Sequence, residues 1–147
     1  MIQKNVVKFK EDIDFNYISK FLDMNTYTSQ FSGLWYEERI FQSVMQIRSV
    51  HKHPKFKKIH SFLNKQFNKH NQKTDLDIFM SWVSGTRSNT HVDPYDVFLV
   101  GAYGRTLYKM DNKEAILEKG DIIHIPKDVT HTAIGLDPRI VLSYALF

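Results

Sequence analysis

Two stretches in the second half of the chain decide the fold. Residues 85–104 read GTRSNTHVDPYDVFLVGAYG, and residues 120–135 read GDIIHIPKDVTHTAIG. In each, an apolar run is bounded by glycine or proline, which is typical of a β-strand between tight turns. His91 and Asp93 are two residues apart, so on a strand their side chains point to the same face. His131 begins a later strand, and we expect it to join that pair as the third ligand of one metal ion.

The rest of the second half has the same character. Short apolar runs separated by turn residues predict strands at 78–84, 92–100, 106–110, 115–118, 121–125, 130–134 and 140–146. Many short strands at close, even spacing are typical of an antiparallel barrel or jelly roll. Residues 76–147 are therefore predicted to form the working β-barrel.

The first half is predicted to be mainly helical. Apolar residues at spacings of three and four predict an amphipathic helix within residues 12–24. Pro54 can open a second helix, because its missing N–H is not needed in the first turn. The stretch 39–50 is ambiguous and could be an edge strand. The expected fold class is α+β and mainly β, with residues 1–75 as a helical segment packed on the barrel in one structural domain.

Composition limits the class of protein. The chain has 147 residues, 42% of them hydrophobic, which suits one domain with a real core. It has no cysteine, so disulfides and thiolate metal sites are excluded. No apolar run is long enough for a transmembrane helix, and residues 1–5 lack the apolar stretch of a signal peptide. We therefore expect a cytoplasmic protein without a membrane partner.

Much of the positive charge lies in one segment. The net charge is +4, and residues 52–73 hold seven lysines and no acidic residue. Such a segment is most often the solvated face of a helix. It can also attract nucleic acid or an acidic protein, so nucleic acid is a partner that we consider but do not favour.

The three predicted ligands have a well-defined chemistry. Two histidines and one carboxylate form the facial triad of non-heme iron(II) oxygenases, which leaves positions open for substrate and O₂. The same ligand types bind manganese, nickel, cobalt and zinc, so the ligand set alone leaves the metal open. His124 lies in the apolar run 122–125, where a hydrogen-bonded wall histidine is a better interpretation than a fourth ligand.

The spacing around these ligands resembles the two motifs of the cupin superfamily. The matching positions are Gly85, His91, Asp93 and Gly104 in the first motif and Gly120, Pro126 and His131 in the second. The 15 residues between Gly104 and Gly120 resemble the shortest inter-motif loop of that superfamily. Asp93 and Val97 replace the second histidine and the glutamate of four-ligand cupins. Asp128 and Gly135 replace the glycine and asparagine that are common in the second motif.

Three ligands with one aspartate resemble the oxygenase branch, and JmjC-type 2-oxoglutarate oxygenases in particular. The likeness covers about residues 77–147 and extends to the JmjC-like ribosomal-protein hydroxylases of bacteria. It implies that His91, Asp93 and His131 bind iron(II) and carry the catalysis. It also implies that 2-oxoglutarate and O₂ are co-substrates, and that a protein or a small molecule is hydroxylated.

The same resemblance indicates where 2-oxoglutarate would bind. In the family, a basic residue thirteen positions after the aspartate pairs with the far carboxylate of the co-substrate. Here that position is Thr106, and the basic residue is its neighbour Arg105. Ser88 matches a hydroxyl position that helps to bind the co-substrate. Tyr108, together with Ser88 and Thr106, could bind a carboxylate through hydrogen bonds.

Two other functions fit the same sequence. Thr106 at the usual basic position favours a metal-binding cupin enzyme that does not use 2-oxoglutarate, such as another dioxygenase or an isomerase. The lysine-rich segment 52–73 favours a non-catalytic binding module. Barrel edges and the apolar N-terminal helices also offer surfaces for a homodimer.

Overall fold

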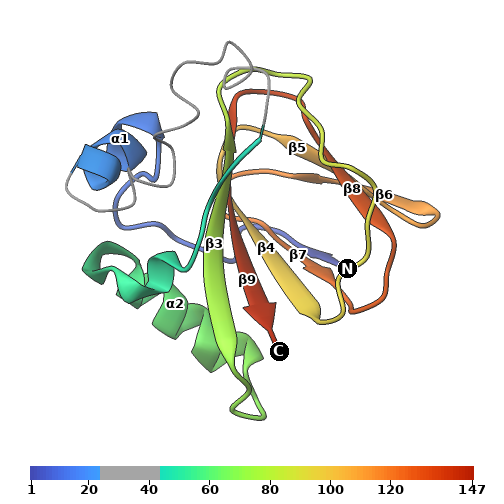
Figure 1. The fold of residues 1–147 in the computed structure, drawn as a ribbon, viewed down its shortest axis with the longest axis horizontal. Helices are drawn as coiled ribbons and strands as arrows, with labels where there is room; N and C mark the ends of the chain where they lie inside the picture. Colours follow the sequence, from blue (N-terminus) through green and yellow to red (C-terminus); the bar gives the residue numbers. More distant parts are fainter. Residues whose placement is uncertain (24–43) are drawn as a thin grey trace.

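The computed structural model describes residues 1–23 and 44–147, which form two antiparallel β-sheets and two α-helices (Figure 1). The larger sheet has the strand order β1 (Ile2–Gln3), β7 (Ile122–Ile125), β4 (Asp96–Tyr103), β9 (Arg139–Leu146), β3 (Thr74–Ser81) and β2 (Met45–Ile47). The smaller sheet has the order β6 (Lys113–Leu117), β5 (Thr106–Met110) and β8 (His131–Gly135). The helices are α1 (Phe15–Asp23) and α2 (Pro54–Phe67), and a short 3₁₀ helix, η3 (Val50–Lys52), precedes α2.

The two sheets pack face to face and share a core. Alternate residues along each strand point to the same face, so one face of each sheet can turn inward. The buried residues between the sheets are Val97, Leu99, Tyr108, Leu117, Ile123, Ile125, Ala133 and Val141. This arrangement is the double-stranded β-helix, or jelly-roll barrel, and it confirms the predicted fold class.

The helices cover the outer face of the larger sheet (Figure 1). Phe56 and Leu63 of α2 are fully buried against that face. β4 and β9 are therefore buried on both faces, which explains why they read as continuous apolar runs rather than as alternating ones. In the described residues, no helix combines the length and the apolar character needed to cross a bilayer.

The first half of the chain contributes strands as well as helices. β1 pairs with β7, and β2 pairs with β3, which begins at Thr74, next to the boundary predicted at residue 75. The helix predicted within residues 12–24 is α1, and the helix predicted from Pro54 is α2. Of the ambiguous stretch 39–50, residues 45–47 form the edge strand β2, whereas 39–43 lie outside the described residues.

An irregular segment widens the smaller sheet at its β8 edge. The N–H groups of Gly85, Ser88 and His91 donate to the carbonyls of Gly135, Ala133 and His131 at 2.7, 2.9 and 3.0 Å. Residues 85–91 therefore run antiparallel to β8 without forming a full strand. This pairing places residues 85–91 of the first sequence motif beside β8, which belongs to the second motif.

Candidate metal centre

His91 and His131 face each other across an isolated pair of backbone hydrogen bonds. The N–H of His91 donates to the carbonyl of His131 at 3.0 Å, and the N–H of His131 donates to the carbonyl of His91 at 2.9 Å. Residues paired in this way project their side chains to the same face. The centroids of the two imidazole rings consequently lie 4.3 Å apart.

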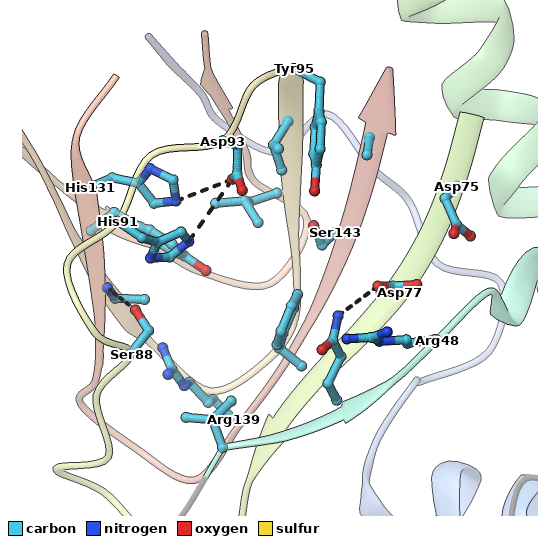
Figure 2. Close-up of a pocket in the computed structure, with 18 of the residues that line it drawn as sticks. Arg48, Asp75, Asp77, Ser88, His91, Asp93, Tyr95, His131, Arg139 and Ser143 are labelled. Carbon is cyan, nitrogen blue, oxygen red and sulfur yellow. Dashed lines mark hydrogen bonds and ion pairs between the residues drawn. The ribbon is translucent and has the colours of Figure 1, made fainter. Parts of the chain in front are cut away.

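Asp93 completes the group from the loop before β4. Its Oδ2 lies 4.0 Å from Nε2 of His91 and 3.6 Å from Nε2 of His131 (Figure 2). The ligand atoms of the three residues all lie within 4.8 Å of one another. The predicted strand 92–100 begins later than expected, at Asp96, and Pro94 has no N–H to donate to a strand ladder. His91 and Asp93 therefore converge through a loop and not through the alternation of one strand.

Backbone carbonyls orient both imidazole rings. Nδ1 of His91 lies 2.7 Å from the carbonyl oxygen of Asn89, and Nδ1 of His131 lies 3.0 Å from that of Val129. A carbonyl only accepts hydrogen bonds, so each Nδ1 carries the proton and each Nε2 keeps its lone pair for a metal ion. His131 is buried, Asp93 is half-buried and His91 is exposed, so an ion can enter past His91.

A cavity of about 410 Å³ extends from the three ligands into the space between the sheets. Its volume is in the range of small-molecule sites, about 300–1,000 Å³. Val97, Leu99 and Ala133 give it an apolar floor. This apolar floor favours the exclusion of water from the space beside His91, Asp93 and His131.

The four residues predicted to bind the co-substrate fall in different places. Ser88 and Tyr108 line the cavity, and Thr106 is buried next to it on the same inward face of β5. Arg105 points away from the cavity, and its Nε pairs with Oδ2 of Asp137 at 2.8 Å on the surface. Strand alternation explains the difference, because a shift of one residue reverses the face.

Arg139 is a cavity residue that the sequence reasoning missed. It stands at the start of β9 and is only 2% exposed. Its side chain makes no hydrogen bond or ion pair with any described residue, and Nε and Nη1 are buried without a partner. Burial lowers the pKa of its guanidinium, because the charged form is desolvated. The only sequence signal was an arginine at the head of an otherwise apolar run, RIVL at 139–142.

Tyr108 presents a protonated hydroxyl close to Arg139. Burial raises the pKa of Tyr108 to about 12, although the positive charge of Arg139 acts in the opposite direction. The phenol therefore remains a neutral donor at ordinary pH. A guanidinium and a phenol together suit an anionic ligand.

The wall formed by β2 and β3 is polar and carries both signs of charge. Asp77 accepts hydrogen bonds from Nε2 of Gln46 and from the N–H of Ser49, each at 2.8 Å. Burial raises the pKa of Asp77, and Arg48 lines the cavity beside it (Figure 2). This wall lies across the cavity from His91 and Ser88, which leaves room for a second ligand.

Two aromatic side chains, Tyr95 and Trp82, lie in different surroundings. Tyr95 lines the cavity and packs at a tilt against Phe147, with a centroid separation of 4.6 Å. Trp82 instead packs on Phe15 of α1 at 4.8 Å. His124 lies away from the ligands, with Nε2 at 2.7 Å from Oδ1 of Asp96 and its ring stacked on Phe98 at 4.5 Å.

The fold is a cupin barrel, and three candidate ligands of the His-Asp-His type converge in it. No protein-family model matches the chain, and no curated protein matches it by sequence. Solved structures do match. The Escherichia coli ribosomal oxygenase YcfD in complex with cobalt and succinic acid matches at TM-score 0.76 and 19% identity. The same protein with cobalt and 2-oxoglutarate matches at TM-score 0.75 and 19% identity.

The matches with YcfD cover different shares of the two chains. Both cover 100% of this chain but 47% of the YcfD chain, so this chain spans about half of the length of that oxygenase. A Streptococcus pyogenes protein of unknown function, SPY1581, matches at TM-score 0.53 and 13% identity, over 71% of this chain and 75% of the other. The chain thus has a JmjC-like cupin fold, as its two sequence motifs indicated.

Proposed function

We propose that this protein is an iron(II)- and 2-oxoglutarate-dependent oxygenase that hydroxylates a protein or a small molecule. The observation that carries the proposal is the convergence of two imidazole Nε2 atoms and one carboxylate at the end of a cavity. That set of ligands occupies one side of a metal ion and leaves the other side open. The similarity to a ribosomal oxygenase bound to cobalt and 2-oxoglutarate supports the same class of reaction.

The three residues fit a divalent metal of the iron type. Both imidazoles are held as the Nε2-ligating tautomer, and Asp93 supplies the single negative charge. Iron(II) bound there would supply the activation of O₂, coupled to decarboxylation of the keto acid. The residues that would hold it are His91, Asp93 and His131.

The remaining residues of the cavity position the organic ligands and keep water away. Ser88 Oγ accepts a 2.9 Å hydrogen bond from the N–H of Ala133, so its own proton is free to donate to a ligand. Val97 and Leu99 line the same cavity with apolar side chains, which would keep water from the reacting atoms. The wall with Asp77 and Arg48 would receive the group that is hydroxylated.

The test is a titration of the metal-free protein under argon. We expect one equivalent of iron(II) to bind, and 2-oxoglutarate then to change the absorption spectrum of the iron. Admission of O₂ should produce succinate. Iron binding with no response to 2-oxoglutarate would instead indicate a metal-dependent cupin that uses no co-substrate.

A matched pair of histidine variants gives the control. His91→Ala removes one ligand, and we expect it to abolish iron binding and succinate formation. His70→Ala makes the same change at an exposed residue remote from the cavity, and both properties should be retained. Equal iron binding in the two variants would overturn the assignment of the ligands.

A further inference from the structure

The wall of the cavity that β2 and β3 form carries charged side chains at inward-facing positions. On β3, Asp75 and Asp77 are two residues apart and both line the cavity, because alternate residues of a strand share a face. Gln46 and Arg48 follow the same alternation at the end of β2 and line the cavity too. Charged groups are costly on the inner face of a barrel unless a partner meets them. This wall is therefore a candidate site for a ligand that carries charge.

Asp77 is held in position for one more partner. Its Oδ2 accepts a hydrogen bond from Nε2 of Gln46 and its Oδ1 accepts one from the N–H of Ser49, each at 2.8 Å. A carboxylate has about four lone-pair sites, so these two bonds leave acceptor capacity on both oxygens. Burial raises the pKa of Asp77, because the charged form is desolvated. A cationic group that entered the cavity would give this carboxylate a counter-charge in direct contact.

Arg48 lies beside Asp77 but does not pair with it. Its guanidinium makes no ion pair or hydrogen bond with any residue that the structure describes. Arg105, by contrast, pairs with Asp137 at 2.8 Å on the surface. Figure 2 shows Arg48 and Asp77 on the same wall, with the guanidinium turned toward the interior of the cavity. An acid and a base that stand side by side without bonding leave a place for a ligand that carries both charges.

The two charges together restrict the chemistry of that ligand. A simple cation would satisfy Asp77 and be repelled by Arg48, whereas a simple anion would be attracted by Arg48 and repelled by Asp77. A small zwitterion satisfies both residues, because its carboxylate can take the two parallel N–H donors of a guanidinium while its ammonium group donates to a carboxylate.

We infer that this wall binds a free α-amino acid, with its carboxylate on Arg48 and its ammonium group on Asp77. The inference rests on the proposed function for the reaction at the metal, and it selects a small molecule over a protein as the substrate. A residue within a protein chain has no charge on its backbone, so it would leave Arg48 or Asp77 without a partner.

The side chain of the amino acid would extend from this wall toward the metal ligands. Figure 2 places His91 across the cavity from Arg48. The floor of the cavity includes Val97 and Leu99, so an aliphatic side chain suits it best. One oxygen atom of O₂ would enter a C–H bond of that side chain, and the other would enter succinate as 2-oxoglutarate loses CO₂.

Calorimetric titration of the metal-free full chain measures the binding of the amino acid apart from the reaction. L-Alanine, L-valine and L-leucine are each compared with the N-acetyl form, which lacks the ammonium charge, and with the amide, which lacks the carboxylate. We expect at least one of the free amino acids to bind more tightly than both of its derivatives, by a factor on the order of 10 to 100 for each charge-assisted contact. Equal binding of the three forms, or no binding of any, would overturn the inference.

Two variants assign the two charges separately. Arg48→Gln should weaken the free amino acid to the affinity of its amide and leave the amide unchanged. Asp77→Asn should weaken it to the affinity of its N-acetyl form and leave that form unchanged. Arg48→Gln removes no hydrogen bond to a described residue, so we expect this variant to remain folded. A free amino acid that bound Arg48→Gln as tightly as the unchanged protein would reject Arg48 as the carboxylate site.

Arg105→Gln is the matched control, because it removes an arginine that pairs with Asp137 on the surface. It should bind the free amino acid as tightly as the unchanged protein does. An equal loss of affinity in Arg105→Gln and Arg48→Gln would reveal a general effect of charge and reject the site.

The reaction itself separates this inference from the proposed function. With iron(II), 2-oxoglutarate and O₂, the amino acid should gain the mass of one oxygen atom while succinate forms. Amino acid binding that Arg48→Gln weakens, without any formation of succinate, would leave this site standing and reject the oxygenase. Formation of succinate by a protein that binds no free amino acid would retain the oxygenase and reject this site.

Discussion

The backbone N–H of Asp128 donates a 2.8 Å hydrogen bond to the carbonyl of Asp93, and this bond joins the turn of the second motif to the loop of the first that carries His91 and Asp93. Asp128 has a φ of +62°, in the left-handed region. Asparagine, aspartate and glycine adopt this region readily, and β-branched residues do so at a cost. The position of the candidate ligand Asp93 therefore depends on a residue outside the group of three.

We predict that Asp128→Gly keeps the metal affinity and that Asp128→Val weakens it. Valine at this φ should destabilise the turn by about 1–2 kcal/mol and loosen the contact with Asp93. Calorimetric titration with cobalt(II) measures the affinity, and thermal unfolding measures the stability. Equal affinities in the two variants would show that the turn does not position Asp93.

Metal binding should stabilise the fold, because the loop with His91 and Asp93 and the strand β8 with His131 meet only in the folded chain. At a metal concentration of about one hundred times Kd, the expected gain in the free energy of unfolding is about 2.7 kcal/mol. Thermal unfolding of the unchanged protein should show this gain as a higher midpoint. His131→Ala should show no metal-dependent change, and an equal rise in that variant would place the binding elsewhere.

Much of the barrel was predictable because its signals are local. Glycine and proline marked the turns, and the strand predicted at 106–110 coincides with β5. Pro54 marked the start of α2, because its missing N–H is not needed in the first turn of a helix. The convergence of His91, Asp93 and His131 was predicted from their spacing, because the cupin motifs that they resemble fix the turns between them.

Other features depend on tertiary contacts that leave no local pattern. β1 has two residues, Ile2–Gln3, which are too few to show any alternation, and it exists because β7 offers a free edge. The face of Arg139 is set by the register of β9 against β3 and β4, so the sequence could not place it in the cavity. The direction of the Arg105 side chain is also set by the strand. Arg105 lies one residue before Thr106, so its side chain points to the opposite face.

Two glycines with positive φ allow a comparison between strain and steric clash. Gly104 has a φ of +66°, and a Cβ there would lie 2.1 Å from the carbonyl oxygen of Pro138. Gly85 has a φ of +81°, but a Cβ there would meet no atom within 4 Å. We predict that Gly85→Ala costs about 1 kcal/mol, from backbone strain alone, and that Gly104→Ala costs several times more. Chemical denaturation measures both, and similar losses would contradict the role of the Pro138 contact.

His124 should be dispensable for metal binding although it lies in the second motif. Its Nε2 is committed to Asp96 at 2.7 Å, and its ring stacks on Phe98 outside the group of ligands. His124→Gln should therefore bind one equivalent of cobalt(II) with unchanged affinity. Its free energy of unfolding should fall by about 1 kcal/mol or less, as expected for the loss of a half-exposed side-chain hydrogen bond. A large loss of cobalt affinity would make His124 part of the site.

Asp121 ties the N-terminal segment to the barrel and should make the stability depend on acid pH. Its buried carboxylate accepts hydrogen bonds from Lys4 Nζ at 2.7 Å, from the N–H of Asn5 at 2.9 Å and from the N–H of Glu118 at 3.1 Å. Burial alone would raise its pKa, but these donors outweigh burial and hold the pKa below the ordinary value of 3.8. The ionised form is therefore favoured in the folded state.

A carboxyl with a lowered folded pKa stabilises the fold fully above its unfolded pKa, and that contribution is lost as the pH falls through the folded value. We predict that Asp121→Ala lowers the free energy of unfolding at pH 7 by about 1–3 kcal/mol, because three donors lose their acceptor. The difference between the two proteins should shrink as the pH falls below about 3.8. Urea unfolding at a series of pH values measures this difference. A difference that stayed constant down to the lowest pH would mean that Asp121 acts through its shape and not through its charge.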